Sequence, residues 1–156
     1  MRLFRSKGKA PDAGPSTVVG GWLRALLLDQ RELTGQLTTT LNYGKPGWND
    51  DEPAVVEALC EIAVREYFGA DYDVRAITSF VSRMRSRVHS VEPPGQLAAE
   101  AVIRFSLGET DVVAGDVKRL EKLGIRIAVL AMARLLLGWD EATVDQRIVE
   151  AGGGGA

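Results

Sequence analysis

Cysteine and histidine are nearly absent from this chain, whose 156 residues include one of each, Cys60 and His89. A disulfide bond within the chain needs two cysteines, and a single buried thiol suits a reducing cytoplasm. Zinc sites use about four cysteine or histidine ligands, or three and a water molecule, which this chain does not provide. A nucleophilic side chain needs a neighbouring base, but His89 lies at a predicted helix end, where an ordinary surface histidine is expected. We therefore predict no catalytic residue, no zinc site and no cofactor.

Long hydrophobic runs and glycine-rich phosphate loops are also missing. The most apolar window, residues 125–139, contains Arg126 and Arg134, and it is shorter than the ~20 mostly apolar residues that cross a bilayer. The pair Gly44-Lys45 is followed by proline, where a phosphate-binding loop needs a hydroxyl group for magnesium. We therefore expect no membrane span, and we place a hydrophobic helix near residues 125–137 in the centre of the fold.

Neither sign of charge dominates, since 19 basic and 21 acidic side chains give a formal net charge of −2. This balance excludes a globally basic nucleic-acid binder but leaves room for a local basic patch. Arginine outnumbers lysine by 14 to 5, which is typical of a GC-rich genome and leads us to expect a bacterial source.

What the sequence does contain is a helical repeat of apolar residues, with spacings of three and four along most of its length. The most regular example is a helix predicted at about residues 73–90, whose apolar seam includes Val74, Ile77, Val81 and Met84. Six or seven such segments are separated by glycine and proline, and strands do not alternate with them. The pattern predicts an all-α fold, a single bundle of six or seven helices over residues 16–151.

Particular residues mark where these helices begin and end. Ser16 or Thr17 is expected to cap a first helix, whose apolar face continues through Leu33. The threonine-rich segment 38–43 fits either a helix end or an extended loop. The acidic residues before Pro53 mark the start of a second helix, which is predicted to stop at Gly69.

The two ends of the chain have little to bury. Residues 1–15 combine two glycines and two prolines with four positive charges, and we predict a flexible basic arm there; its charged residues are Arg2, Arg5, Lys7 and Lys9. No apolar stretch follows these charges, so an export signal is not expected. Residues 152–156 are four glycines and an alanine, which predicts a disordered tail.

Acidic residues concentrate in segment 50–73, which contains eight carboxylates and one basic residue, Arg65. Such a cluster could hold Mg²⁺, which prefers oxygen ligands, as all-α magnesium-dependent nucleotide hydrolases do with paired carboxylates. Here Glu57 and Glu61 are four residues apart, and no second carboxylate pair is found on another helix. We interpret these acidic residues as helix starts and a solvated helix face. Whether they bind a metal ion stays open.

Arginines concentrate in the next helix, at Arg83, Arg85 and Arg87. On a helix they lie on the two edges of the apolar seam, and serines occupy the outward centre. A helix that binds in a nucleic-acid groove would instead concentrate its basic residues at that outward centre. We interpret Arg83 and Arg87 as structural or interface residues, for which the acidic segment, in the same chain or in a second copy, is a suitable partner.

The preferred hypothesis is a non-enzymatic cytoplasmic helical module, with a regulatory role as one option, that binds another protein or a second copy of itself. The loop at 43–48 adds two aromatic contact candidates, although the tryptophan can also cover the core. The candidate partner-binding residues are Tyr43, Trp48, Asp50, Asp51, Glu57, Arg83 and Arg87. The alternative is a nucleic-acid-associated regulator that uses the basic arm and the helix face of Lys118, Arg119 and Lys122.

Overall fold

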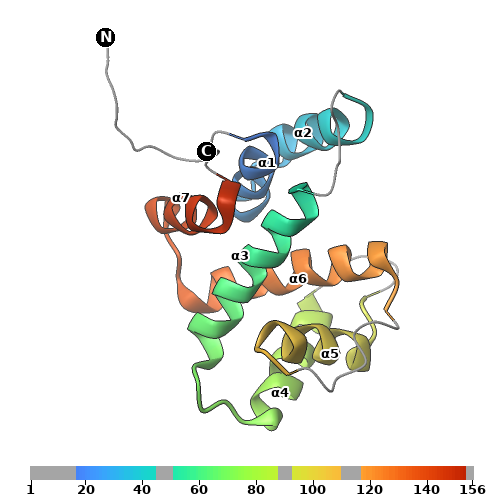
Figure 1. Ribbon diagram of the computed structural model, residues 1–156, viewed down its shortest axis with the longest axis vertical. Helices are drawn as coiled ribbons and strands as arrows, with labels where there is room; N and C mark the ends of the chain where they lie inside the picture. The colour runs from blue at the N-terminus through green and yellow to red at the C-terminus, as the bar shows by residue number, and fades with distance from the viewer. Residues whose placement is uncertain (1–16, 45–50, 88–92, 110–116, 154–156) are drawn as a thin grey trace. The chain divides into compact units, whose positions relative to one another are not determined.

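The computed structural model describes residues 17–44, 51–87, 93–109 and 117–153, with only the backbone described at positions 51, 52, 119 and 120. The described residues form seven α-helices and no strand, which confirms the predicted all-α fold (Figure 1). None of the described helices combines the length and apolar character that a membrane span requires. The chain divides into two compact units: Val56–Gly138 is one, and the residues on either side of it in the sequence form the other.

In the unit formed by the flanking residues, α1 (Val18–Leu27) and α2 (Arg31–Tyr43) form a helical hairpin (Figure 1). The hydroxyl of Thr17 accepts a hydrogen bond from the Gly20 amide at 3.0 Å, as the predicted cap requires. The prediction of one helical face continuing through Leu33 was wrong, because the chain turns between the two helices. Asp29 adopts a left-handed conformation with φ of 59°, and the Gln30 amide donates to the Ala25 carbonyl.

The threonine-rich segment 38–43 is helical throughout. Threonine is stiff at χ1, but its hydroxyl can donate to a carbonyl one turn earlier in the helix. Thr38, Thr39 and Thr40 each make this bond, at 2.7, 3.1 and 3.2 Å. The Thr38 hydroxyl also accepts a hydrogen bond from the indole nitrogen of buried Trp22 at 2.9 Å, which ties α2 to α1.

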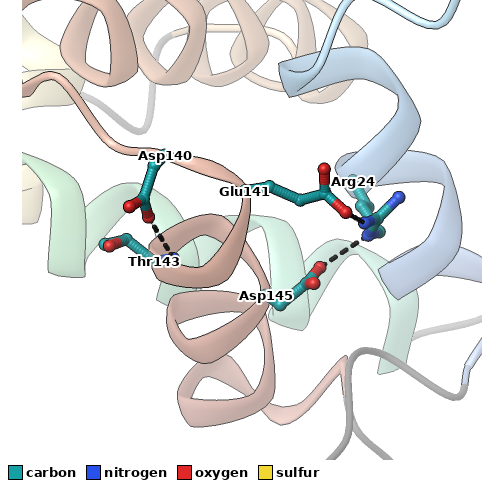
Figure 2. A network of polar contacts seen from close by, with 5 residues as sticks. All are labelled: Arg24, Asp140, Glu141, Thr143 and Asp145. Carbon is teal, nitrogen blue, oxygen red and sulfur yellow. Dashed lines mark hydrogen bonds and ion pairs between the residues drawn. The ribbon is translucent and has the colours of Figure 1, made fainter.

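The same unit contains α7 (Glu141–Ile148) and a following π-helical turn, Val149–Gly153. The Asp140 carboxylate caps α7 by accepting from the Thr143 amide at 2.8 Å, and this bond lowers the pKa of Asp140. Figure 2 shows Arg24 of α1 between two carboxylates of α7: its guanidinium donates to Asp145 at 2.6 Å and to Glu141 at 2.5 Å. The Asp145 bond is the main reason why the pKa of Arg24 is raised.

We expect Arg24→Gln to lower the free energy of unfolding by about 1–2 kcal/mol, because a charged hydrogen bond between partly buried groups is lost. The side chains of Arg24 and Asp145 are 26% and 24% exposed. The control is Arg31→Gln, since Arg31 and its partner Asp29 are 89% and 80% exposed and contribute little. Urea unfolding followed by tryptophan fluorescence compares the two variants. Equal decreases in the free energy of unfolding for the two variants would show that the ion pairs of Arg24 do not stabilise the contact between α7 and α1.

The unit at Val56–Gly138 contains most of α3 (Asp51–Phe68), together with α4 (Val74–Arg87), α5 (Gln96–Ser106) and α6 (Arg119–Leu137). α3 ends at Gly69, as predicted, where φ is 74°. α6 continues through Gly124, and Gly138 ends it in a left-handed conformation. Residues from all four helices are fully buried in this core, among them Leu59, Ile77, Phe80, Ile103, Ile125 and Leu130.

The hydrophobic segment at 125–137 is buried along one side of α6. Val129, Leu130 and Ala133 have no exposed surface, whereas Leu135 is 47% exposed. The predicted basic arm at 1–15 lies outside the described residues, and so do positions 154–156 of the glycine-rich tail. Gly152 and Gly153 belong to the π-helical turn after α7.

Candidate interaction surface

α4 has one fully buried side and one exposed polar side. Its buried side consists of Ile77, Phe80, Val81 and Met84, as their spacing predicts, but Val74, predicted in the same seam, is 48% exposed in the first turn. This burial fixes the rotation of the helix, so Arg75 and the serines lie on the opposite side in solvent, and Arg83 and Arg87 are exposed at one edge of the buried seam. We call these exposed residues the α4 arginine face, and they are Arg75, Ser79, Ser82, Arg83, Ser86 and Arg87.

One flank of α4 is held by α5, which runs antiparallel to it. The Thr78 hydroxyl donates to Glu100 at 3.2 Å, and the Gln96 side chain donates to the Thr78 carbonyl at 3.2 Å. Arg85 Nε donates to the Pro94 carbonyl at 2.7 Å, so its guanidinium links α4 to the segment just before α5. Arg85 therefore has a structural role that separates it from Arg83 and Arg87.

Most arginines in the described part of the chain are matched by an acid. The matched pairs are Arg24 with Glu141 and Asp145, Arg31 with Asp29, Arg65 with Glu61, Arg104 with Glu109, Arg126 with Glu57, and Arg147 with Glu150. The guanidinium groups of Arg75, Arg83 and Arg87 make neither an ion pair nor a hydrogen bond with any described residue. All three are exposed and belong to the α4 arginine face.

The acidic segment is partly neutralised within its own unit. Glu57 lies 3.9 Å from Arg126, and Glu61 accepts from Arg65, one turn later in α3, at 3.0 Å. The Asp73 carboxylate accepts from the Arg75 amide at 2.9 Å and so caps the start of α4. Asp50 lies outside the described residues, and the side chain of Asp51 is not described.

Neither Arg83 nor Arg87 forms an ion pair with a described acid of segment 50–73. Asp71, in the connection between α3 and α4, is exposed and also makes no ion pair or hydrogen bond with a described residue. The predicted ion pairs between these two arginines and the acidic segment 50–73 are therefore not formed within the described part of one chain.

The other candidate contacts fall on separate elements. Tyr43, the last residue of α2, is 84% exposed, whereas Trp48 lies outside the described residues. Lys118 is exposed at the start of α6, and Lys122 is half-buried one turn later. The side chain of Arg119 is not described, and the arm residues Arg2, Arg5, Lys7 and Lys9 lie outside the described residues.

A small polar cluster lies inside the core around Cys60. The thiol is fully buried, and burial raises its pKa to about 12, although Arg126 and the hydrogen bond with Ser106 act in the opposite direction. The Ser106 hydroxyl donates to the Val102 carbonyl at 2.9 Å. Because the thiolate is the reactive form of cysteine, this environment keeps Cys60 chemically inert. His89, the other residue considered for nucleophilic chemistry, lies outside the described residues.

Among the residues that the structure describes, no three histidine, cysteine or carboxylate side chains gather into a group that could hold a metal ion. Comparisons of the chain with protein-family models, with curated proteins and with solved structures gave no match. The α4 arginine face is therefore the feature on which a function can be argued. Its third arginine, Arg75, was not among the predicted residues, although it lies eight positions before Arg83 on the outward side of the same helix.

Proposed function

We propose that this chain is a non-enzymatic helical interaction module of the cytoplasm, which binds an acidic protein surface through the α4 arginine face. The observation that carries the proposal is the set of three exposed arginines, Arg75, Arg83 and Arg87, that no described acid neutralises. The acidic surface can belong to another protein or to a second copy of the chain.

The chemistry of the face favours carboxylates as its ligands. A guanidinium group presents donors in a planar fork that matches both oxygens of a carboxylate. Arg83 and Arg87 are one helical turn apart, and Arg75 lies about 12 Å further along the axis. Because one exposed ion pair contributes only about 0–1 kcal/mol, binding depends on several pairs together. Charge complementarity of this kind chiefly sets specificity and association rate.

A protein partner suits the surroundings of the face better than a nucleic acid. The exposed carboxylates of Asp71 and Asp73 lie beside Arg75 at the start of α4, where they repel the closely spaced phosphates of a nucleic acid more strongly than a protein surface on which acids alternate with uncharged residues. The chain as a whole carries a net charge of −2. Lys118 and Lys122 keep the nucleic-acid alternative open, and the test below separates the two ligands.

The test measures fluorescence anisotropy of a labelled oligoglutamate peptide and of a single-stranded DNA oligonucleotide of equal charge. We expect the folded chain to bind the peptide at low salt. The triple variant Arg75→Gln/Arg83→Gln/Arg87→Gln is expected to weaken peptide binding by at least about tenfold, because all three guanidinium contacts are lost. Circular dichroism checks that the variant keeps its helices.

The matched control is Arg31→Gln/Lys118→Gln/Lys122→Gln, which removes the same amount of charge away from the α4 arginine face. It is expected to leave peptide binding nearly unchanged. An equal loss in both variants would mean that only net charge matters and would contradict the proposal. Preferential binding of the DNA, lost in the control variant, would establish the nucleic-acid alternative.

A further inference from the structure

Among the residues that the structure describes, unpaired charges of opposite sign lie near the two ends of α4, with the unpaired Arg75 at the same end as the unpaired Asp71. Asp71 precedes the first turn of the helix, whereas Arg83 and Arg87 lie in its last two turns. From Val74 to Arg83 the helix rises ~14 Å, so the aspartate cannot reach these arginines within one chain. The exposed aspartates at the start of α4 outnumber Arg75 there, whereas the exposed charges of its last two turns, Arg83 and Arg87, are basic.

We propose that two copies of the chain associate through antiparallel α4 helices, with Arg83 of each copy paired to Asp71 of the other. This inference rests on the proposed function and names the acidic partner as a second copy. An antiparallel pair brings the acidic end of one helix beside the basic end of the other. Under two-fold symmetry each contact is made twice, and the interface closes as a dimer.

The sequence of the α4 arginine face fits this register. When Arg83 lies opposite Asp71 of the second copy, Arg75 lies opposite Ser79, and the two Arg75 residues are offset by about one helical turn. The small side chains of Ser79 and Ser86 leave room for a second helix at the exposed centre of the face, whereas the Ser82 hydroxyl donates to Gln96 of α5 at 3.5 Å.

The association is expected to be weak and salt-sensitive, since its ion pairs are solvent-exposed. Sedimentation equilibrium of the full chain tests it at ~0.01 M salt, where the Debye length is about 30 Å, and at ~1 M salt, where it is about 3 Å. We expect a concentration-dependent dimer at the lower salt concentration that dissociates at the higher one.

Charge reversal tests the register itself. Arg83→Glu places two acids opposite each other at each contact, and Asp71→Arg places two arginines there, so each variant is expected to dimerise at least about tenfold more weakly. An equimolar mixture of the two variants restores opposite charges at both contacts and is expected to form a heterodimer. The double variant Asp71→Arg/Arg83→Glu is expected to recover the homodimer, and Arg31→Glu is the control for loss of net charge.

The outcomes separate this inference from the proposed function. A wild-type chain that stays monomeric at low salt overturns the dimer, while the oligoglutamate measurement still decides whether the α4 arginine face binds acidic surfaces. A dimer that both single variants leave intact overturns the α4 contact. Variants that keep their helices but fail to associate when mixed overturn the pairing of Arg83 with Asp71.

Discussion

Phe80→Ala is expected to lower the free energy of unfolding by about 3–5 kcal/mol, the cost of removing a large aromatic side chain from a packed core. Phe80 is 2% exposed. Its ring centroid lies 5.3 Å from that of Tyr67 and 5.4 Å from that of Phe68, both at the end of α3. Because α3 is fixed by its own buried residues, we expect the cavity to collapse only in part.

Phe105→Ala is the matched control, since it removes the same atoms from a side chain that is 46% exposed. Its expected cost is about 1 kcal/mol or less. Circular dichroism is the suitable probe for urea unfolding, because Trp22, Trp48 and Trp139 all fall within the residue ranges of the other unit. Equal losses for the two phenylalanine variants would contradict the packing of α4 against α3.

The sequence allowed the helices to be predicted where apolar spacing and helix-ending residues agreed. The seam of α4 and the stop at Gly69 are of this kind. The break after α1 was missed because no glycine or proline marks it. Asp29 provides the left-handed conformation there, which aspartate adopts more readily than most residues but which spacing alone does not reveal.

The surface was predictable only in part, for a physical reason. Helical geometry indicates which arginines point outward, and it placed Arg83 and Arg87 correctly at the exposed edge of α4. Whether an arginine is matched depends on tertiary contacts, such as that between Arg126 and Glu57, which are far apart in the sequence. Helical geometry placed Arg85 on the other edge of the seam, but its hydrogen bond to the Pro94 carbonyl depends on the path of the chain after α4 and could not be predicted from spacing.

The second large effect is expected in alkaline solution, where the stability that the buried Cys60 thiol contributes should be lost. Burial raises its pKa from the ordinary value of 9.0 to about 12 in the folded chain. Below pH 9 the thiol is protonated in both the folded and the unfolded state, so its full contribution is present. Between pH 9 and 12 the unfolded state releases the proton while the folded state retains it, and unfolding is favoured by about 1.4 kcal/mol for each pH unit.

The variant Cys60→Ala isolates this effect, because it removes the titrating group while keeping a small apolar side chain in the core. Urea unfolding of both proteins from about pH 8 to about pH 11 gives the difference between their free energies of unfolding. Lysines and tyrosines also titrate in this range, but their contributions are common to both proteins and cancel in the difference. The advantage of the wild-type chain is expected to be constant below pH 9 and to fall steadily above it. A difference that stays constant through pH 11 would show that Cys60 is open to water and ionises as readily in the folded chain as in the unfolded one.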